Sequence, residues 1–134
     1  MKILVGTDVQ SIDEVSASID EFGSRYTRKI FTEHEMECCG SHPAAAAQGL
    51  AVRFAAKEAV LKILDTTRSV PPWKSIEVRR ISGGRPEIHL RDEAAQLAHD
   101  QGISGISLSL SHGAGIANAV VVAQVDESQG KAPS

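Results

Sequence analysis

The sequence predicts a single α+β domain in which a largely antiparallel sheet packs against helices. At 134 residues the chain has the length of one domain, and 42% hydrophobic with 23% charged residues is a globular composition. Within residues 103–111, Ile106, Leu108 and Leu110 alternate with Ser107, Ser109 and Ser111, and a glycine-containing turn at 113–115 and an apolar segment over 116–125 follow. This pattern predicts two adjacent antiparallel strands. The domain spans residues 1–125, and we expect 126–134 to form a flexible C-terminal tail.

The chain begins with a predicted strand and a predicted helix. Residues 2–9 are apolar enough to form a buried strand, and Ser11 with Glu14 has the spacing of a capping box. The helix that starts there is expected to end at Gly23. One face of this helix carries Ile12, Val15, Ile19 and Phe22.

Two further helices are predicted before the middle of the chain. Thr32 and Glu35 form a second capping box, which opens a short helix that ends at Gly40. Pro43 suits the first turn of a longer helix that continues through four alanines to about Leu64. An apolar stripe along this long helix contains Leu50, Phe54 and Leu61.

The second half of the chain predicts a hairpin and one more helix before the C-terminal strands. A turn at 71–72 precedes an apolar strand over 76–81, and a glycine pair at 83–84 separates it from a strand over 87–91. These two strands are expected to pair as a hairpin. A short helix over 92–101 then leads to the alternating strand.

Charge is segregated along the chain although the formal net charge is only −3. Residues 1–40 carry −4, residues 53–91 carry +5 and residues 92–134 carry −4. The acidic total argues against a general nucleic-acid binder. The basic middle third has two interpretations: solvated helix and strand faces, or a site for a phosphorylated ligand.

The sequence also bears on location and redox state. No apolar run approaches the ~20 residues that span a bilayer, and Gly6 and Asp8 interrupt the N-terminal apolar segment too early for a signal peptide. We therefore expect a soluble, cytoplasmic protein without membrane contact. Cys38 and Cys39 are adjacent and cannot easily pair with each other, so we interpret them as reduced structural thiols.

Glu58 is unusual because its spacing puts a carboxylate in the apolar stripe of the long helix. One interpretation is an intrahelical ion pair with Lys62, four residues later. The other is a metal ligand or a general base, which Arg53, Lys57 and Lys62 would surround with cationic donors suited to phosphate groups.

Two other positions could contribute to a site. Asp8 follows Gly6, where glycine allows another group to approach the backbone closely, and it is either a helix cap or a second acidic ligand. Two carboxylates would suit a hard, partly hydrated cation such as Mg²⁺ bound together with substrate phosphates. Ser111 and His112 are too sparse a signal for a nucleophilic triad, and His112 considered alone is typical of a turn.

Several motifs that occur in one order give the chain a specific resemblance. They are Gly6-Thr7-Asp8, Phe31-Thr32-x-x-Glu35-x-x-Cys38, Arg53-Phe54-Ala55-Ala56-Lys57-Glu58-Ala59-x-x-Lys62, Trp73-x-x-Ile76-Glu77-Val78, Gly84-Arg85-Pro86 and Ser109-Leu110-Ser111-His112. Together they resemble the holo-acyl-carrier-protein synthase family, the small trimeric class of 4′-phosphopantetheinyl transferases, over about residues 3–124. The block from Phe54 to Ala59 is the most diagnostic.

The resemblance implies a 4′-phosphopantetheinyl transferase-like fold and an enzyme activity. The 4′-phosphopantetheine arm of coenzyme A would be transferred to a serine of an apo acyl carrier protein, with release of adenosine 3′,5′-bisphosphate. By match to the family's motifs, Asp8 and Glu58 would hold Mg²⁺, and Lys62 would reach the coenzyme A pyrophosphate. Either Glu58 or a metal-bound water would act as the base for the serine hydroxyl.

The resemblance also implies partners and an assembly. The nucleotide end of coenzyme A would lie partly across a subunit interface of a homotrimer, and the residues that match its binding positions are Arg53, Gly84, Arg85, Pro86 and His112. The serine-bearing face of 103–111 is a candidate lining for the centre of that trimer. Arg25 and Lys29 match carrier-docking positions, whereas Glu14 stands where the family often has arginine. The alternative is a non-catalytic trimeric domain that binds coenzyme A or serves as a scaffold, and fatty-acid and polyketide carriers both stay open.

Overall fold

Three strands form the larger of two antiparallel sheets in the computed structural model, which describes residues 1–80 and 84–126. Strand β1 (Lys2–Ser11) lies at one edge, β5 (Ile116–Val125) in the centre and β4 (Ile103–Gly113) at the other edge. The predicted pair of C-terminal strands is therefore confirmed. A third strand joins this pair, because β1 pairs with β5 along the whole length of β1.

The second sheet is the predicted hairpin, formed by β2 (Ile76–Arg80) and β3 (Pro86–Leu90). Part of the predicted hairpin, residues 81–83, lies outside the described residues. The predicted tail lies outside them as well, apart from Asp126, whose backbone N–H donates to the carbonyl of Gly102 at 2.8 Å. The predicted α+β class and the antiparallel pairing are confirmed, and the strands divide into two sheets.

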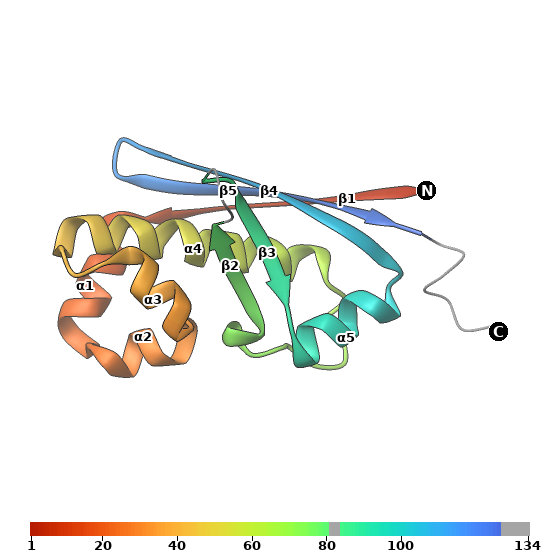
Figure 1. Cartoon of the computed structure of the whole chain (residues 1–134), viewed down its shortest axis with the longest axis horizontal. Coiled ribbons are helices and arrows are strands. Elements are labelled where there is room, and N and C mark those ends of the chain that lie inside the picture. The colour runs from red at the N-terminus through yellow and green to blue at the C-terminus, as the bar shows by residue number, and fades with distance from the viewer. Residues whose placement is uncertain (81–83, 127–134) are drawn as a thin grey trace.

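Helix α4 (Pro43–Ile63) runs along one face of the larger sheet (Figure 1). Helices α1 (Ile12–Phe22), α2 (Ser24–Ile30) and α3 (Glu33–Cys39) gather beneath one end of α4, while α5 (Asp92–Asp100) lies beneath the other (Figure 1). No helix in the described part of the chain is long and apolar enough to cross a membrane.

The sequence predicted every one of these helices except α2. Gly23, with φ of 55°, ends α1 as expected, but it also begins α2 directly. A helix of seven residues is too short to show apolar periodicity, and packing stabilises this one because Thr27 and Ile30 are buried. At the end of α1, Phe22 was expected on the buried face, yet it is 44% exposed.

The two predicted capping boxes differ in the structure. The Thr32 hydroxyl accepts a hydrogen bond from the Glu35 N–H at 3.2 Å, and the Glu35 carboxylate accepts one from the Thr32 N–H at 3.0 Å. This box is complete, as predicted. At α1 only the first half forms, in which the Ser11 hydroxyl accepts from the Glu14 N–H at 3.1 Å.

Helix α4 is buried around most of its circumference, and this corrects the predicted single stripe. Its most buried positions include the alanines Ala51, Ala55, Ala56 and Ala59, each 0% exposed, whereas Phe54 and Leu61 are only half-buried. The sheet covers one side of α4, and α1, α3 and β2 pack on others. A helix enclosed on several sides buries small residues wherever a neighbouring backbone comes close.

The larger sheet has one covered face and one exposed face. Its β1 residues Leu4, Gly6 and Asp8 share the face that packs on α4. The opposite side, here called the outer face, is exposed in the single chain. It carries Ile3, Val5, Val9, Ile116 and Val120 together with the three serines of the alternating strand, Ser107, Ser109 and Ser111.

Candidate active site

The crossing of β1 over α4 brings Asp8 beside Glu58 and Lys62. A Cβ atom at Gly6 would lie 2.2 Å from the carbonyl oxygen of Ala59, so only glycine allows the strand to approach the helix this closely. Asp8 follows Gly6 by two residues and therefore lies on the same face of β1. Glu58 and Lys62 lie on either side of Ala59 along α4. Three predicted site residues thus converge at one crossing.

Lys62 binds the strand rather than its own helix. Its ammonium donates to the Thr7 carbonyl at 2.7 Å and lies 3.2 Å from Asp8 Oδ1. The second Asp8 oxygen, Oδ2, accepts a hydrogen bond from the Gln10 amide at 2.7 Å. Half of the Lys62 side chain stays exposed, so the ammonium is open to a ligand as well.

Glu58 is the unpaired carboxylate of this group. It makes no hydrogen bond or ion pair to the residues that the structure describes. Burial raises the pKa of the Glu58 carboxyl, the charge of Asp8 raises it further, and Lys62 partly offsets both effects. Two carboxylates therefore repel each other with one ammonium nearby.

This geometry resolves the alternatives that the sequence left open. The expected intrahelical pair of Glu58 with Lys62 is wrong, because Lys62 pairs with Asp8. Glu58 also does not face the core, since it is half-buried beside the strand. Asp8 is no helix cap, because Ser11 caps α1.

The donor set fits a hard divalent cation. Carboxylate oxygens are the ligands that Mg²⁺ prefers, and a cation would relieve the repulsion between Asp8 and Glu58. Within residues 1–80 and 84–126, no group of three or more His, Cys, Asp or Glu side chains is placed to hold a metal by itself. Two carboxylates suit an ion that keeps water and shares phosphate oxygens of a ligand.

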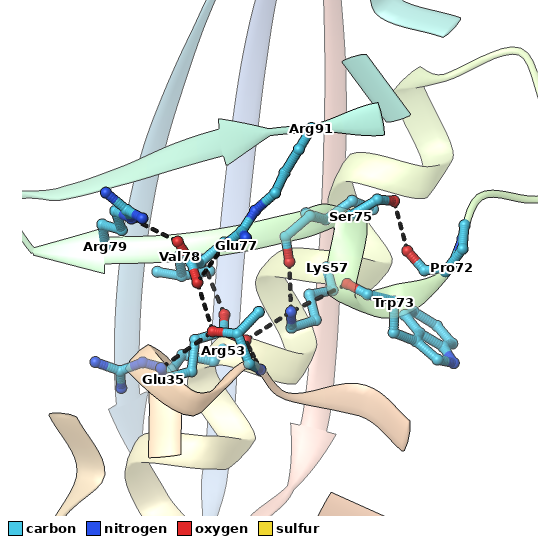
Figure 2. A network of polar contacts seen from close by, with 12 residues as sticks. Glu35, Arg53, Lys57, Pro72, Trp73, Ser75, Glu77, Val78, Arg79 and Arg91 are labelled. Carbon is cyan, nitrogen blue, oxygen red and sulfur yellow. Dashed lines mark hydrogen bonds and ion pairs between the residues drawn. The ribbon is translucent and has the colours of Figure 1, made fainter. Parts of the chain in front are cut away.

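A buried polar network lies on the other side of α4 (Figure 2). Lys57 and Glu35 are both fully buried and form an ion pair at 2.8 Å. The same ammonium donates to the carbonyls of Trp73 and Ile76, and Glu35 also accepts from the Val78 N–H at 2.9 Å. This network joins α3, α4 and β2.

The network corrects the expectation that three cations surround Glu58. Lys57 is fully buried against Glu35, so it cannot reach a phosphate beside Glu58. Arg53 is 4% exposed and donates from Nη1 to the Gly49 carbonyl at 3.0 Å, while its Nε has no hydrogen-bond partner among the described residues. Of the three, only Lys62 lies with Glu58.

The remaining predicted ligand residues gather near β4. Gly84, Arg85 and Pro86 line a cavity of about 390 Å³ together with Leu108 to Leu110 and Arg80. Arg80 holds this turn, since its Nη1 donates to the Gly84 carbonyl at 2.6 Å. The sequence analysis missed Arg80, and its signal was the adjacent Arg79-Arg80 pair within the basic middle third. His112 lies two residues beyond Leu110 and contacts Gln48 of α4.

The two groups lie at opposite edges of the larger sheet. Asp8 pairs with Ala119 of β5, which pairs in turn with Leu110 of β4. The Asp8 group is thus at the β1 edge, whereas His112 and the 84–86 turn are at the β4 edge. The central strand β5 lies between them.

A third set of predicted residues occupies α2. Arg25 and Lys29 are exposed there, and Arg28 adds a third exposed cation that the sequence analysis did not single out. The Arg25 guanidinium lies 6.0 Å from the ring centroid of the exposed Phe22. Glu14, by contrast, is exposed on α1, which carries no basic residue in its last turn.

Known proteins that resemble the chain agree on one family. Residues 4–119 match the model of the 4′-phosphopantetheinyl transferase superfamily. The holo-[acyl-carrier-protein] synthase of Ruminiclostridium cellulolyticum is 36% identical over 129 residues, which is 96% of each chain. The synthase of Desulforudis audaxviator is 39% identical over 108 residues, covering 81% of this chain and 82% of its own.

Solved structures show the same fold. The holo-[acyl-carrier-protein] synthase of Neisseria meningitidis superposes with a TM-score of 0.76 at 28% identity, covering 90% of this chain and 96% of its own. The synthase of Helicobacter pylori, in complex with coenzyme A, has a TM-score of 0.76 at 25% identity and covers 90% of this chain and 100% of its own. Because the family model, the relatives and the solved structures all match, the chain belongs to the holo-[acyl-carrier-protein] synthase family of the 4′-phosphopantetheinyl transferase superfamily.

Proposed function

We propose that the chain transfers the 4′-phosphopantetheine arm of coenzyme A to a serine of an apo acyl carrier protein. The observation that carries this conclusion is the convergence of Asp8, Glu58 and Lys62 at the β1–α4 crossing, in a chain of the synthase family. In the reaction the serine oxygen bonds to the phosphorus of the pantetheine phosphate. The bond from that phosphorus to the bridging oxygen breaks, the serine proton is released, and adenosine 3′,5′-bisphosphate leaves.

Each residue of this group has a proposed role. Asp8 and Glu58 would hold Mg²⁺, which as a Lewis acid neutralises the charge that develops on the phosphates. Lys62, half exposed and 3.2 Å from Asp8, would donate to the pyrophosphate. Glu58 has no hydrogen-bond partner of its own among the described residues, so it is also available to accept the serine proton.

The nucleotide end of coenzyme A is assigned to the β4 edge. Arg80 and residues 84–86 offer two guanidinium groups and backbone amides at the cavity there, and His112, two residues beyond Leu110 of the cavity lining, would add its imidazole. Arg53 would add its positive charge from within α4, where its side chain is 4% exposed and its Nε is buried without a hydrogen-bond partner among the described residues. These groups suit a phosphorylated ligand.

We propose a homotrimer, which the separation of the two groups supports. In one chain they lie at opposite edges of the larger sheet with β5 between them, whereas in the assembly adjacent subunits would each supply one group of a shared site. The outer face gives such an assembly an apolar surface, with Val5 63% and Val9 60% exposed. Each of three interfaces would then contain one complete site.

The carrier is proposed to dock on α2. Arg25 and Lys29 supply positive charge, and the exposed Phe22 supplies an apolar contact beside them. An apo acyl carrier protein is the proposed partner, with fatty-acid and polyketide carriers both open, and the cytoplasm is the proposed compartment, as the sequence predicts.

One experiment tests the central proposal. The chain is mixed with coenzyme A, Mg²⁺ and an apo acyl carrier protein, and intact-mass spectrometry follows the carrier. We expect a mass gain of one phosphopantetheine that is lost when the metal is chelated. Coenzyme A binding without any mass gain on fatty-acid and polyketide carriers would instead support the non-catalytic domain.

A further inference from the structure

The imidazole of His112 has one side-chain partner among the described residues, and it comes from a helix that is distant in sequence. The Nε2 atoms of Gln48 and His112 lie 2.8 Å apart. Gln48 is in the second turn of α4, whereas His112 is the penultimate residue of β4. Gln48 lies outside the motifs of the resemblance and has no role in the proposed transfer.

The chemistry of this contact determines how the imidazole is protonated. A glutamine Nε2 is an amide nitrogen with two N–H donors and no acceptor. With Gln48 Nε2 as the donor, His112 Nε2 accepts, and the ring proton of the neutral imidazole is then on Nδ1. The hydrogen-bond donor that His112 can offer a ligand is then its Nδ1–H.

The backbone around His112 does not orient the ring by itself. His112 is exposed, and it stands next to the turn that joins β4 to β5, where Ala114 and Gly115 both have positive φ. The ring is thus fastened at the backbone by the hairpin and at its Nε2 end by α4. An exposed side chain with two such attachments loses fewer rotamers when it binds a ligand.

We propose that Gln48 is a positioning residue, which holds His112 in its Nδ1–H tautomer and directs that donor toward the nucleotide phosphate of coenzyme A. This inference rests on the proposed function, because His112 is assigned to the nucleotide end there. It adds a residue of α4 to the β4-edge group, and it assigns the ring nitrogen that meets the ligand.

The tautomer is tested without any substrate. Long-range ¹H–¹⁵N spectra of the free protein at pH about 8.5, well above the usual histidine pKa, separate the Nδ1–H from the Nε2–H form. The His112→Ala variant assigns the His112 signals among the five histidines. We expect Nδ1–H in the wild type and loss of that preference in Gln48→Leu. The Gln48→Glu variant should shift the proton to Nε2, because a carboxylate accepts where the amide donates.

The effect on the ligand is measured by calorimetry with coenzyme A and no carrier. Gln48→Leu should weaken coenzyme A binding by about threefold to tenfold, which is the range that one net hydrogen bond supports. It should have no further effect in the His112→Ala background, because Gln48 acts through the imidazole. The matched control is Gln96→Leu, which removes another glutamine hydrogen bond, from the Gln96 amide to Asp100 at 2.8 Å on α5. This control should bind like the wild type.

Four results would overturn the inference. An Nε2–H tautomer in the wild type would mean that the amide is reversed and accepts. An equal loss of affinity on Gln48→Leu with and without His112 would mean that Gln48 acts independently of the ring. Weaker binding in His112→Ala with unchanged binding in Gln48→Leu would overturn the positioning role alone, whereas unchanged binding in His112→Ala would overturn the nucleotide assignment of His112 as well.

Discussion

Among single residues, Glu58 combines the least favourable electrostatics with the most important proposed role. Its pKa is raised by burial and by Asp8, so the native state holds a proton at Glu58 more tightly than the unfolded chain does. The contribution of this group to stability therefore falls as pH rises from its ordinary pKa through the raised one. A protein that keeps such a carboxylate gives up some stability for function.

We expect Glu58→Gln to lose at least about 100-fold in turnover, the scale of a missing electrostatic contact to the transition state. Its urea unfolding midpoint at pH 7 should be equal to or above that of the wild type, because the substitution removes the repulsion with Asp8. Glu93→Gln, exposed on α5, is the matched control and should change neither property. Near-normal turnover of Glu58→Gln at saturating Mg²⁺ would contradict the role of this residue.

The pKa of Glu77 is shifted in the opposite direction to that of Glu58. Burial alone would raise the pKa of Glu77, but hydrogen bonds from Thr32 and Arg79 and the charge of Arg91 lower it to about 2 (Figure 2). A depressed native pKa means that the unfolded state binds the proton more readily, so Glu77 stabilises the fold above its ordinary pKa. That stabilisation is lost as pH falls toward 2.

The free energy of unfolding should therefore decline more gradually below pH about 4.5 in Glu77→Gln than in the wild type. Urea unfolding at a series of pH values measures this slope. Glu87→Gln, whose half-exposed carboxylate lies 3.3 Å from His89 Nε2, is the control and should keep the wild-type slope. Parallel curves for the wild type and Glu77→Gln would show that Glu77 does not titrate in this way.

Among the elements, α4 carries both the buried network and the site, on adjacent residues. Lys57 is fixed by Glu35 and by two carbonyls on one side of the helix, while Glu58 faces β1 on another. The network therefore sets the rotation of α4 from which Glu58 and Lys62 reach Asp8. It is structural, although it lies within the most diagnostic motif of the chain.

Lys57→Met keeps most of the side-chain volume but leaves Glu35 as an unpaired buried charge. We expect it to lower the free energy of unfolding by about 3–5 kcal/mol, measured by urea denaturation. Lys74→Met, exposed in the turn before β2, should change stability by less than about 0.5 kcal/mol. A small effect at Lys57 would mean that Glu35 is satisfied by its two backbone N–H donors.

Helix α2 is the element to which carrier recognition is assigned. Arg25→Glu together with Lys29→Glu should raise the KM for the carrier by roughly tenfold and weaken its salt dependence, because exposed charges mainly steer encounter. The dissociation constant for coenzyme A should not change. Lys2→Glu with Arg68→Glu reverses two exposed charges away from α2 and is the matched control. Carrier kinetics that respond equally to both pairs would place the docking surface elsewhere.

For the whole molecule, the outer face and the separation of the two residue groups both favour association with further copies of the chain. An exposed apolar sheet face favours association, and a ligand shared between subunits requires it. Val5→Asp is expected to shift the protein from trimer to monomer in sedimentation equilibrium and to abolish transfer. Val70→Asp introduces the same charge at a valine that is 65% exposed outside the sheet, and it should leave both properties unchanged.

Mixed subunits test the shared site directly, as the second arm of this prediction. Trimers refolded from Glu58→Gln and His112→Ala chains should regain part of the activity that each variant lacks, because some interfaces then contain two native halves. Verified mixed trimers without any activity, or full activity in a monomer, would contradict the shared site.

Much of the fold could be predicted because its signals are local. The alternation over 103–111, the capping residues and the proline at the start of α4 each depend on neighbours within a few positions. The motif resemblance also identified the family, and it named Asp8, Glu58 and Lys62 as one group. Helix α2 was missed because seven residues show no periodicity, and only its packing stabilises it.

The sequence by itself determined the family and every described α-helix and strand except α2, and it named the residues that are proposed for the chemistry. Only the tertiary structure decided which of them meet, because those contacts join positions far apart in the chain. Lys62 has Glu58 four residues away, yet it binds Thr7 and Asp8, more than fifty residues earlier. The sequence does not distinguish Lys57 from a lysine that binds a ligand, but in the fold Lys57 is buried in an ion pair with Glu35. The order β1-β5-β4 likewise separates the two residue groups, and no local pattern encodes a strand order.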